Sequence, residues 1–188
     1  MSSFDYLGTL CLSHPDTMNA SLQPKPGHPD PRRASALRAL VIFVGLPASG
    51  KSTFFRTHFA ATHRHVSKDL MRNVRNRDQR QRELIAEALT NGQSVVVDNV
   101  NASKVERAHL VALGRAHGGR IIGYHFASDV RDCLERNATR GGRQRVPDVA
   151  VYVAAKRLEV PSYAEGFDCL YRVRLVGQSD YEITALPA

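Results

Sequence analysis

One short segment combines glycines, a lysine and a hydroxyl side chain in a pattern that suits phosphate. Residues 45–52 read Gly-Leu-Pro-Ala-Ser-Gly-Lys-Ser, which fits GxxxxGK[ST]. Glycines let a backbone curl round an anion, and the N–H groups at a helix start are neutral phosphate donors. We expect Lys51 to reach the β- and γ-phosphates of a nucleotide, and the Ser52 hydroxyl to ligate Mg²⁺. The residues expected to contact the nucleotide are Gly45, Pro47, Ala48, Ser49, Gly50, Lys51, Ser52 and Thr53.

A carboxylate follows a second apolar run. Residues 95–97 are all valine and Asp98 comes next. Because ligands bind outside the carboxyl ends of parallel strands, we expect Asp98 to serve the same Mg²⁺ as Ser52, directly or through a water molecule. The alternative is that Asp98 only caps a helix or closes a turn.

An acid and a base stand close together after the first expected helix. Asp69 and Arg72 are three residues apart in a stretch predicted to be helical over residues 69–77, so their side chains would share a face. A carboxylate there could accept a hydroxyl proton as general base, and a guanidinium could form a bidentate contact with an acceptor phosphate. The alternative is a helix cap with an exposed ion pair.

An arginine-rich segment follows later in the chain. Residues 136–145 hold Arg136, Arg140, Arg143 and Arg145 around a Gly-Gly pair. Arg136 and Arg140 are four residues apart, so one helical face could present both. A phosphoryl-transfer enzyme must exclude water, so we interpret the segment as a closing lid whose arginines neutralise the transferred group. A solvated basic loop is the alternative.

The elements that would position these residues alternate between strands and helices. Apolar runs predict buried strands over residues 39–44, 94–97 and 120–126, a short strand at 65–66, and an edge strand over 170–176. Such alternation predicts an α/β fold in three layers, with a mostly parallel central sheet of about five strands and a helical lid.

The rest of the chain is informative mainly through composition. Residues 1–38 contain five prolines and no clear periodicity, which predicts a flexible leader before one domain over residues 39–188. The net charge of +8 favours an acidic partner such as nucleic acid. No apolar run approaches the length of a membrane span and no signal-peptide pattern is visible, so we expect a cytoplasmic protein without membrane contact.

Several of these residues together resemble the 5′-hydroxyl polynucleotide kinases, which include the kinase domain of polynucleotide kinase-phosphatase and the phage polynucleotide kinase. The resemblance runs from Val41 to Leu175. It rests on the phosphate loop, the Asp69/Arg72 pair, the run from Val96 to Asn101, and the segment from Arg136 to Pro147. It implies a P-loop NTPase fold that uses ATP and Mg²⁺, and an acceptor nucleic acid with a 5′-OH end.

The resemblance also implies roles for single residues. Asp69 would be the general base for the 5′-OH, and Arg72 would contact the neighbouring phosphate of the acceptor. Lys51, Arg136 and Arg140 would surround the transferred phosphoryl group. The chain lacks the DxDxT signature of a phosphatase, so repair of a 3′ end would need a separate phosphatase or ligase partner.

Three positions depart from the pattern, and two other functions stay open. Ala48 replaces a common glycine, Lys68 a common arginine, and Val100 the threonine of the Asp-Asn-Thr-Asn run. A kinase of the same fold could instead act on a small metabolite or nucleotide-sugar, as zeta-type toxins do. A non-catalytic nucleotide-binding module is the second alternative. The sequence does not separate RNA from DNA or ATP from other nucleotides.

Overall fold

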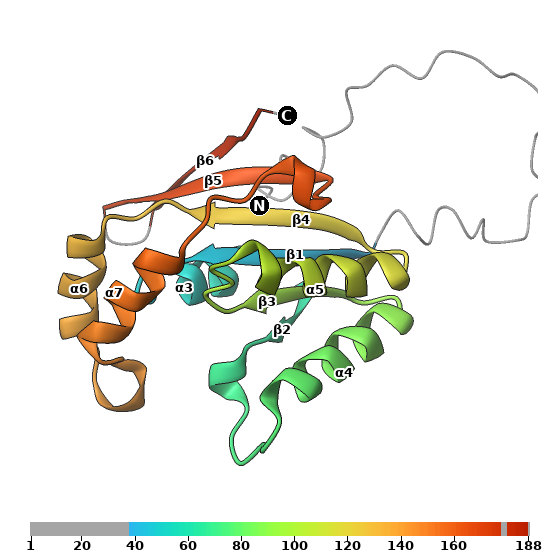
Figure 1. Ribbon diagram of the computed structural model, residues 1–188, viewed down its shortest axis with the longest axis horizontal. Helices are drawn as coiled ribbons and strands as arrows, with labels where there is room; N and C mark the ends of the chain where they lie inside the picture. The colour runs from blue at the N-terminus through green and yellow to red at the C-terminus, as the bar shows by residue number, and fades with distance from the viewer. Residues whose placement is uncertain (1–37, 178–179, 188) are drawn as a thin grey trace, which may run out of the picture. The chain divides into compact units, whose positions relative to one another are not determined.

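The computed structural model describes residues 38–177 and 180–187. Its centre is a sheet of six strands in the order β2-β3-β1-β4-β5-β6 (Figure 1). The strands are β1 (Ala39–Gly45), β2 (His63–Val66), β3 (Ser94–Asp98), β4 (Arg120–Phe126), β5 (Cys169–Val176) and β6 (Asp180–Ala185). Neighbouring strands from β2 to β5 pair in parallel, whereas β6 pairs antiparallel with β5. The predicted mostly parallel sheet is therefore confirmed.

Helices cover both faces of the sheet. They are α3 (Lys51–His58), α4 (Arg77–Thr90), α5 (Lys104–Ala116), α6 (Val130–Ala138) and α7 (Asp148–Arg157). Helices α4 and α5 pack on one face, α3 lies on the other, and α6 and α7 stand together beyond the carboxyl ends of β1 and β4 (Figure 1). The described residues also contain three short 3₁₀ turns: η1 (Lys68–Leu70), η2 (Gly142–Gln144) and η3 (Tyr163–Glu165). The three-layer α/β fold is confirmed.

Strand β1 joins the two halves of the core because its side chains alternate between the faces. Leu40, Ile42 and Val44 belong to the cluster that includes residues of α4 and α5. Phe43 faces the other way, with ring centroids 5.8 Å from Phe54 and 5.1 Å from Phe126. The strand that precedes the phosphate loop is thus fixed from both sides.

A buried ion pair holds the loop that follows β3. The Arg107 side chain is fully buried, and its guanidinium donates to both carboxylate oxygens of Glu165, at 2.7 and 2.9 Å. It also donates to the carbonyl oxygens of Asn101 and Ala102, at 3.0 and 2.8 Å. All four of these acceptors are oxygen atoms, so the charge is compensated in the interior. Helix α5, η3 and the end of the β3 loop therefore form one unit.

The last part of the sheet differs from the prediction. Residues 170–176 were expected at an edge, but β6 lies outside β5, so that prediction is wrong and the sheet has six strands rather than about five. Arg172 and Arg174 alternate with buried residues because one face of β5 is open to solvent. Arg174 pairs across the strands with Glu182, at 3.5 Å. The alternation of arginines with apolar residues in β5 therefore indicates that one face of the strand is exposed, and it does not indicate that the strand lies at the edge of the sheet.

The leader predicted over residues 1–38 lies, apart from Arg38, outside the described residues. In residues 38–177 and 180–187, none of the helices has the length and apolar character that crossing a membrane requires.

We predict that Arg107→Met lowers the free energy of unfolding by about 3–5 kcal/mol, because it leaves the Glu165 carboxylate buried without its partner. Urea unfolding measures the change. The control is Arg115→Met, which breaks the more exposed pair with Asp168 and should cost less than about 1 kcal/mol. Equal losses for both variants would contradict this account of the core.

Candidate active site

The phosphate loop connects β1 to α3 and needs its glycines. A Cβ atom on Gly45 would lie 2.8 Å from Cβ of Phe126, so the end of β4 leaves room for hydrogen only. Gly50 has φ of 95°, which is unstrained for glycine. Pro47 and Ala48 form the turn between them, and Ala48 has φ of 61°. The glycine expected at position 48 would therefore relieve strain, because left-handed backbone is costly for other residues.

Lys51 curls back into this loop. Its ammonium donates to the carbonyl oxygens of Gly45 and Leu46, at 2.9 and 2.6 Å, and lies 3.3 Å from the Ser49 hydroxyl. Burial lowers the pKa of Lys51 to about 8, although the charge of Asp98 acts in the opposite direction. The positive charge of the buried Lys51 ammonium is therefore only partly balanced by negative charge in the protein. A phosphate chain bound in the loop would supply the missing negative charge.

The predicted metal ligands Ser52 and Asp98 are in contact. Register places Asp98 of β3 beside Phe43 of β1, two residues before the loop begins. The Ser52 hydroxyl donates to Oδ2 of Asp98 at 2.7 Å. Burial raises the pKa of Asp98, but hydrogen bonds from His65 and Ser52 and the charge of Lys51 outweigh it, so the pKa lies below its ordinary value. An ionised carboxylate beside a hydroxyl is an oxygen donor set that fits Mg²⁺.

His65 is a site residue that sequence reasoning missed. Its Nε2 lies 3.0 Å from Oδ2 of Asp98, and its ring stacks on Phe55 with centroids 3.9 Å apart. An ionised carboxylate can only accept, so Nε2 carries the proton in this bond. Oδ2 of Asp98 thereby receives two donors. The signal in the sequence was weak, since one histidine in a short strand reads as a packing residue.

Asp69 and Arg72 do not share a helix, so that part of the prediction is wrong. Asp69 lies in η1, whose first residue follows Ser67, and the backbone leaves helical geometry at Met71, where ψ is 85°. Asn73 then has φ of 58°. Asp69 and Arg72 are both exposed. Asn and Ser favour such local turns over a continuous helix, which is the physical reason for the difference.

Asn99, the residue after Asp98, holds the turn that carries Asp69. Its Oδ1 accepts from the Lys68 backbone N–H at 3.0 Å, and its Nδ2 donates to Oε1 of Gln81 at 2.6 Å. Asn101 donates to the Phe43 carbonyl at 2.7 Å. The run after β3 therefore links the phosphate loop to η1 and α4.

A cleft of about 720 Å³ opens on this side of the sheet. Its lining comes from η1, α4, the β3 loop and α5, and consists of Lys68, Asp69, Asp78, Gln81, Arg82, Asn99, Val100, Asn101, Glu106, His109 and Leu110. The charges are mixed, because Lys68 pairs with Asp78 at 2.5 Å. Asp69 lies in this wall, and its charge acts on the pKa of Lys51. None of the phosphate-loop residues 45–52 lines the cleft, and Asp69 is the predicted site residue in its wall.

The arginine-rich segment reaches the loop from the other side. Arg136 donates from Nε to the Ala48 carbonyl at 2.9 Å, so it supports the strained turn. Helix α6 ends at Ala138, so Arg140 lies beyond it and the two arginines do not share a helical face as predicted. The charge of Arg140 nevertheless lowers the pKa of Lys51. Asn137 joins the two ends of the segment. Its Nδ2 donates to the Val146 carbonyl and to the Asp148 carboxylate, and its Oδ1 accepts from the Val146 N–H.

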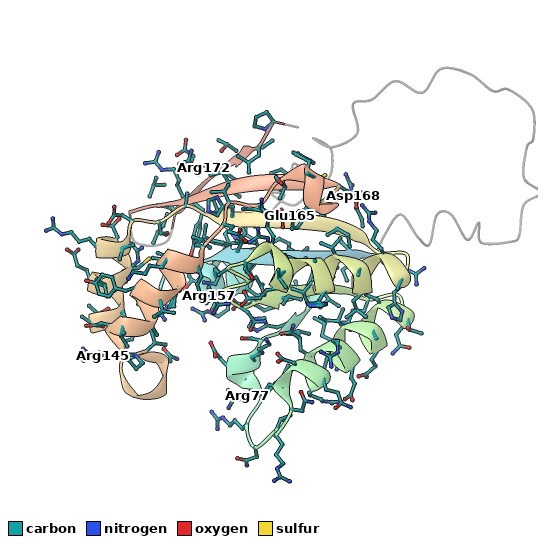
Figure 2. The ribbon with its side chains drawn as sticks, in the orientation of Figure 1. Arg77, Arg145, Arg157, Glu165, Asp168 and Arg172 are labelled. Atoms are coloured by element: carbon teal, nitrogen blue, oxygen red, sulfur yellow. The ribbon has the colours of Figure 1, made fainter. Side chains whose placement is uncertain are left out.

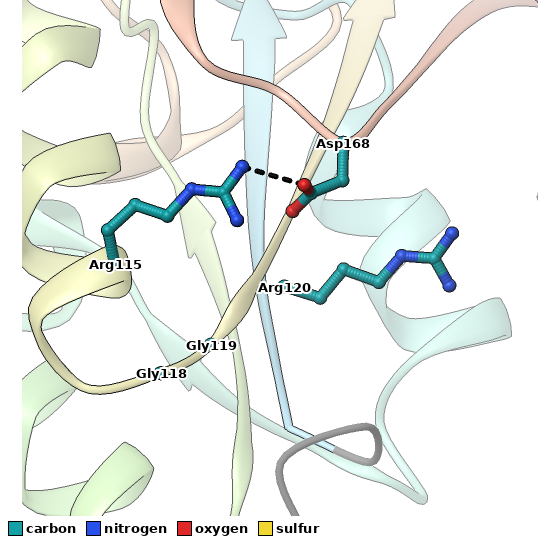
Figure 3. A pocket seen from close by; sticks show the side chains of 5 residues that line it. All are labelled: Arg115, Gly118, Gly119, Arg120 and Asp168. Carbon is teal, nitrogen blue, oxygen red and sulfur yellow. Dashed lines mark hydrogen bonds and ion pairs between the residues drawn. The ribbon is translucent and has the colours of Figure 1, made fainter. Parts of the chain in front are cut away.

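A second hollow, of about 520 Å³, lies at the opposite end of the sheet, where β4 begins (Figure 3). Arg115 donates to Asp168 across it at 2.6 Å. Asp168 also accepts from the Ile121 N–H at 2.6 Å. These contacts connect the start of β4 to α5 and to the segment that follows η3. None of the predicted site residues lines this hollow.

Several known proteins are similar to this chain in sequence or in fold. A curated relative, the bifunctional polynucleotide phosphatase/kinase of Schizosaccharomyces pombe, is 26% identical over 161 residues, which cover 84% of this chain and 38% of the relative. A fungal RNA kinase superposes with a TM-score of 0.58 at 15% identity over 73% of this chain and 38% of that one. Chaetomium thermophilum Kti12 in complex with ADP-AlF3 superposes with a TM-score of 0.56 at 18% identity, over 75% of this chain and 90% of that one.

At these identities the two structures show the fold alone. The chain also spans well under half the length of the curated relative. A family model described as an AAA domain matches residues 40–161, which contain the phosphate loop, Asp69, Asp98 and the arginine-rich segment. The chain therefore belongs to this family, AAA_33, whose members are P-loop kinases that bind nucleotide.

Proposed function

We propose that this chain transfers the γ-phosphoryl group of ATP to the 5′-hydroxyl of a polynucleotide. The observation that carries the proposal is that separate segments meet at the phosphate loop. The Ser52 hydroxyl donates to Asp98 of β3 at 2.7 Å, and Arg136 of α6 donates to the Ala48 carbonyl at 2.9 Å. The Lys51 ammonium is buried against two carbonyl oxygens of the loop itself. Phosphoryl transfer needs that combination, because catalysis consists mainly of positioning and of neutralising charge. The S. pombe relative, whose name includes polynucleotide kinase, supports this choice of acceptor.

The nucleotide end of the reaction uses the loop and its neighbours. The N–H groups of the loop and the ammonium of Lys51 would hold the β- and γ-phosphates. Ser52 and Asp98 would hold Mg²⁺, which supplies positive charge at the bridging oxygens when it is bound. Arg136 and Arg140 would neutralise the equatorial oxygens of the transferred group. His65 keeps the Asp98 carboxylate in one orientation.

The acceptor end uses Asp69. Its exposed carboxylate lies in the wall of the cleft, where a hydroxyl can approach. The acceptor oxygen attacks the γ-phosphorus, its proton passes to Asp69, and the bond to the β-phosphate oxygen breaks to release ADP. The product is a 5′-phosphate. Arg72 would hold the next phosphate of the acceptor as a bidentate partner.

The cleft lining carries mixed charge, and the support for a polyanionic acceptor comes from arginines in the segment between Asp69 and Asp78 of its wall. Arg72 and Arg75 are exposed on the connection between η1 and α4, and Arg77 is exposed at the first position of α4. Figure 2 shows Arg77 at this start of α4 and Arg145 on the connection between α6 and α7. Exposed arginines attract phosphodiester chains by releasing counterions. We assign the activity to residues 39–188 as one kinase domain and place any phosphatase or ligase step in a separate partner.

The first prediction concerns Asp69. Asp69→Asn should lower kcat for transfer of labelled γ-phosphate to a 5′-OH oligonucleotide by about 10²–10⁴-fold, because the amide cannot accept the proton. Its affinity for ADP should stay within about two-fold of wild type, since Asp69 lies outside the loop. Asp132→Asn, an exposed carboxylate on α6, is the control and should be fully active. An active Asp69→Asn protein would refute the assigned base.

The second prediction concerns the acceptor. Arg72→Ala should raise the KM for the oligonucleotide about ten-fold or more, because it removes a hydrogen bond to a charged phosphate. The KM for ATP should not change. Arg131→Ala, on the exposed face of α6, is the matched control. A wild-type protein that phosphorylates small alcohols but no 5′-OH oligonucleotide would instead support the small-molecule kinase.

The third prediction uses the lowered pKa of Lys51, about 8 in the free protein. Phosphate favours the ammonium, so the pKa of Lys51 rises on binding. Above pH 8 the complex therefore binds more protons than the free protein, and affinity for ADP should fall as pH rises, by up to about ten-fold per pH unit. Calorimetry at pH 8.5 in buffers of different ionisation enthalpy should detect proton uptake. Binding without proton uptake would contradict the assigned state of Lys51.

A further inference from the structure

A residue of the last strand reaches the phosphate loop. Tyr181 of β6 donates its hydroxyl to the carbonyl oxygen of Gly50 at 3.0 Å, across 131 positions of sequence. The family model ends at residue 161, so β6 lies outside the region that defines the family. The contact is therefore a feature of this chain that the family assignment does not explain.

This bond fixes one peptide group of the loop. The Gly50 oxygen also accepts from the Phe54 N–H at 2.9 Å, which is the first helical bond of α3. A trans peptide is planar, with its C=O and N–H pointing in opposite directions. Two donors on the Gly50 oxygen therefore orient the Lys51 N–H away from Tyr181, as one of the helix-start donors available to phosphate.

The tyrosine ring is itself held in place. Its centroid lies 4.9 Å from that of Phe54 at 69°, an edge-to-face contact, and 5.9 Å from that of His58 at 82°. A Cβ atom on Gly50 would lie 3.2 Å from the Tyr181 oxygen, so glycine at this position also makes the contact possible. Burial raises the pKa of Tyr181, so its hydroxyl keeps its proton and remains a donor.

We propose that Tyr181 is a positioning residue for the nucleotide, which holds the Gly50–Lys51 peptide in the orientation that binds phosphate. The β5–β6 hairpin is thereby part of the nucleotide site. Tyr181 acts through the loop rather than through the acceptor. The inference rests on the nucleotide-binding half of the proposed function and is independent of which hydroxyl receives the phosphoryl group.

The test is removal of one hydroxyl. Tyr181→Phe keeps the ring on Phe54, so the melting temperature of the free protein should stay within about 2 °C of wild type. Its dissociation constant for ADP, measured by calorimetry, should rise about five-fold, because without the bond the Gly50–Lys51 peptide leaves the binding orientation more often and only the fraction in that orientation binds. Tyr152→Phe, which removes an exposed hydroxyl on α7, is the matched control and should bind ADP as wild type does.

Hydrogen exchange gives a second readout that needs no ligand. Amides of residues 45–53 should exchange faster in Tyr181→Phe than in wild type, whereas amides of β4 should not change. Unchanged ADP affinity in Tyr181→Phe would overturn the proposal, whether or not the melting temperature falls, and so would unchanged exchange in the loop. Failure of transfer to oligonucleotides would bear on the acceptor alone, because ADP binding is measured without one.

Discussion

The site depends on an ammonium that the protein buries against neutral oxygens. Lys51 is held by two loop carbonyls and lies beside a hydroxyl, and its pKa is lowered because burial outweighs nearby negative charge. A buried cation of this kind is costly in the free protein. An anion bound in the loop would offset the free-energy cost of burying this charge. The loop is therefore suited to an anionic ligand. The surrounding structure serves to keep that arrangement in place.

Three kinds of support act on the loop. The parallel pairing of β1 with β3 brings Asp98 to Ser52, and His65 fixes the carboxylate from β2. Arg136 contacts the Ala48 carbonyl from α6. The buried Arg107–Glu165 pair holds the end of the β3 loop, where Asn101 returns to β1. Each contact joins an element that is distant in sequence, which explains why the site needs the whole fold.

The sequence predicted the parts of this site that depend on local pattern. The phosphate loop, the strand before it and the aspartate after the valines follow from residue types and spacing, and the structure has the strands where they were expected. The capping box of Ser103 and Glu106 at the start of α5 is a feature of the same local kind. These features are local, because neighbouring residues determine them.

The predictions that were wrong, and the residues that were missed, depend on contacts between distant parts of the sequence or on turns. The prediction that Asp69 and Arg72 share a helix was wrong because the backbone leaves helical geometry at Met71, between the two residues. Strand β6 was missed because Arg172 and Arg174 in β5 indicated an edge. The roles of His65 and Tyr181 could not be predicted from local pattern, since each residue gains its role from a partner remote in sequence. The roles of Asp69, Arg72, Arg136 and Arg140 stay predictions.

The most direct measurement is a crystal structure of the protein with a non-hydrolysable ATP analogue, Mg²⁺ and a short oligonucleotide that ends in a 5′-hydroxyl. We expect the γ-phosphate to lie between Lys51 and Arg140, with the 5′-oxygen in line with its phosphorus and within hydrogen-bond distance of the Asp69 carboxylate. An oligonucleotide bound away from the cleft, or an Asp69 carboxylate turned from the 5′-oxygen, would contradict it.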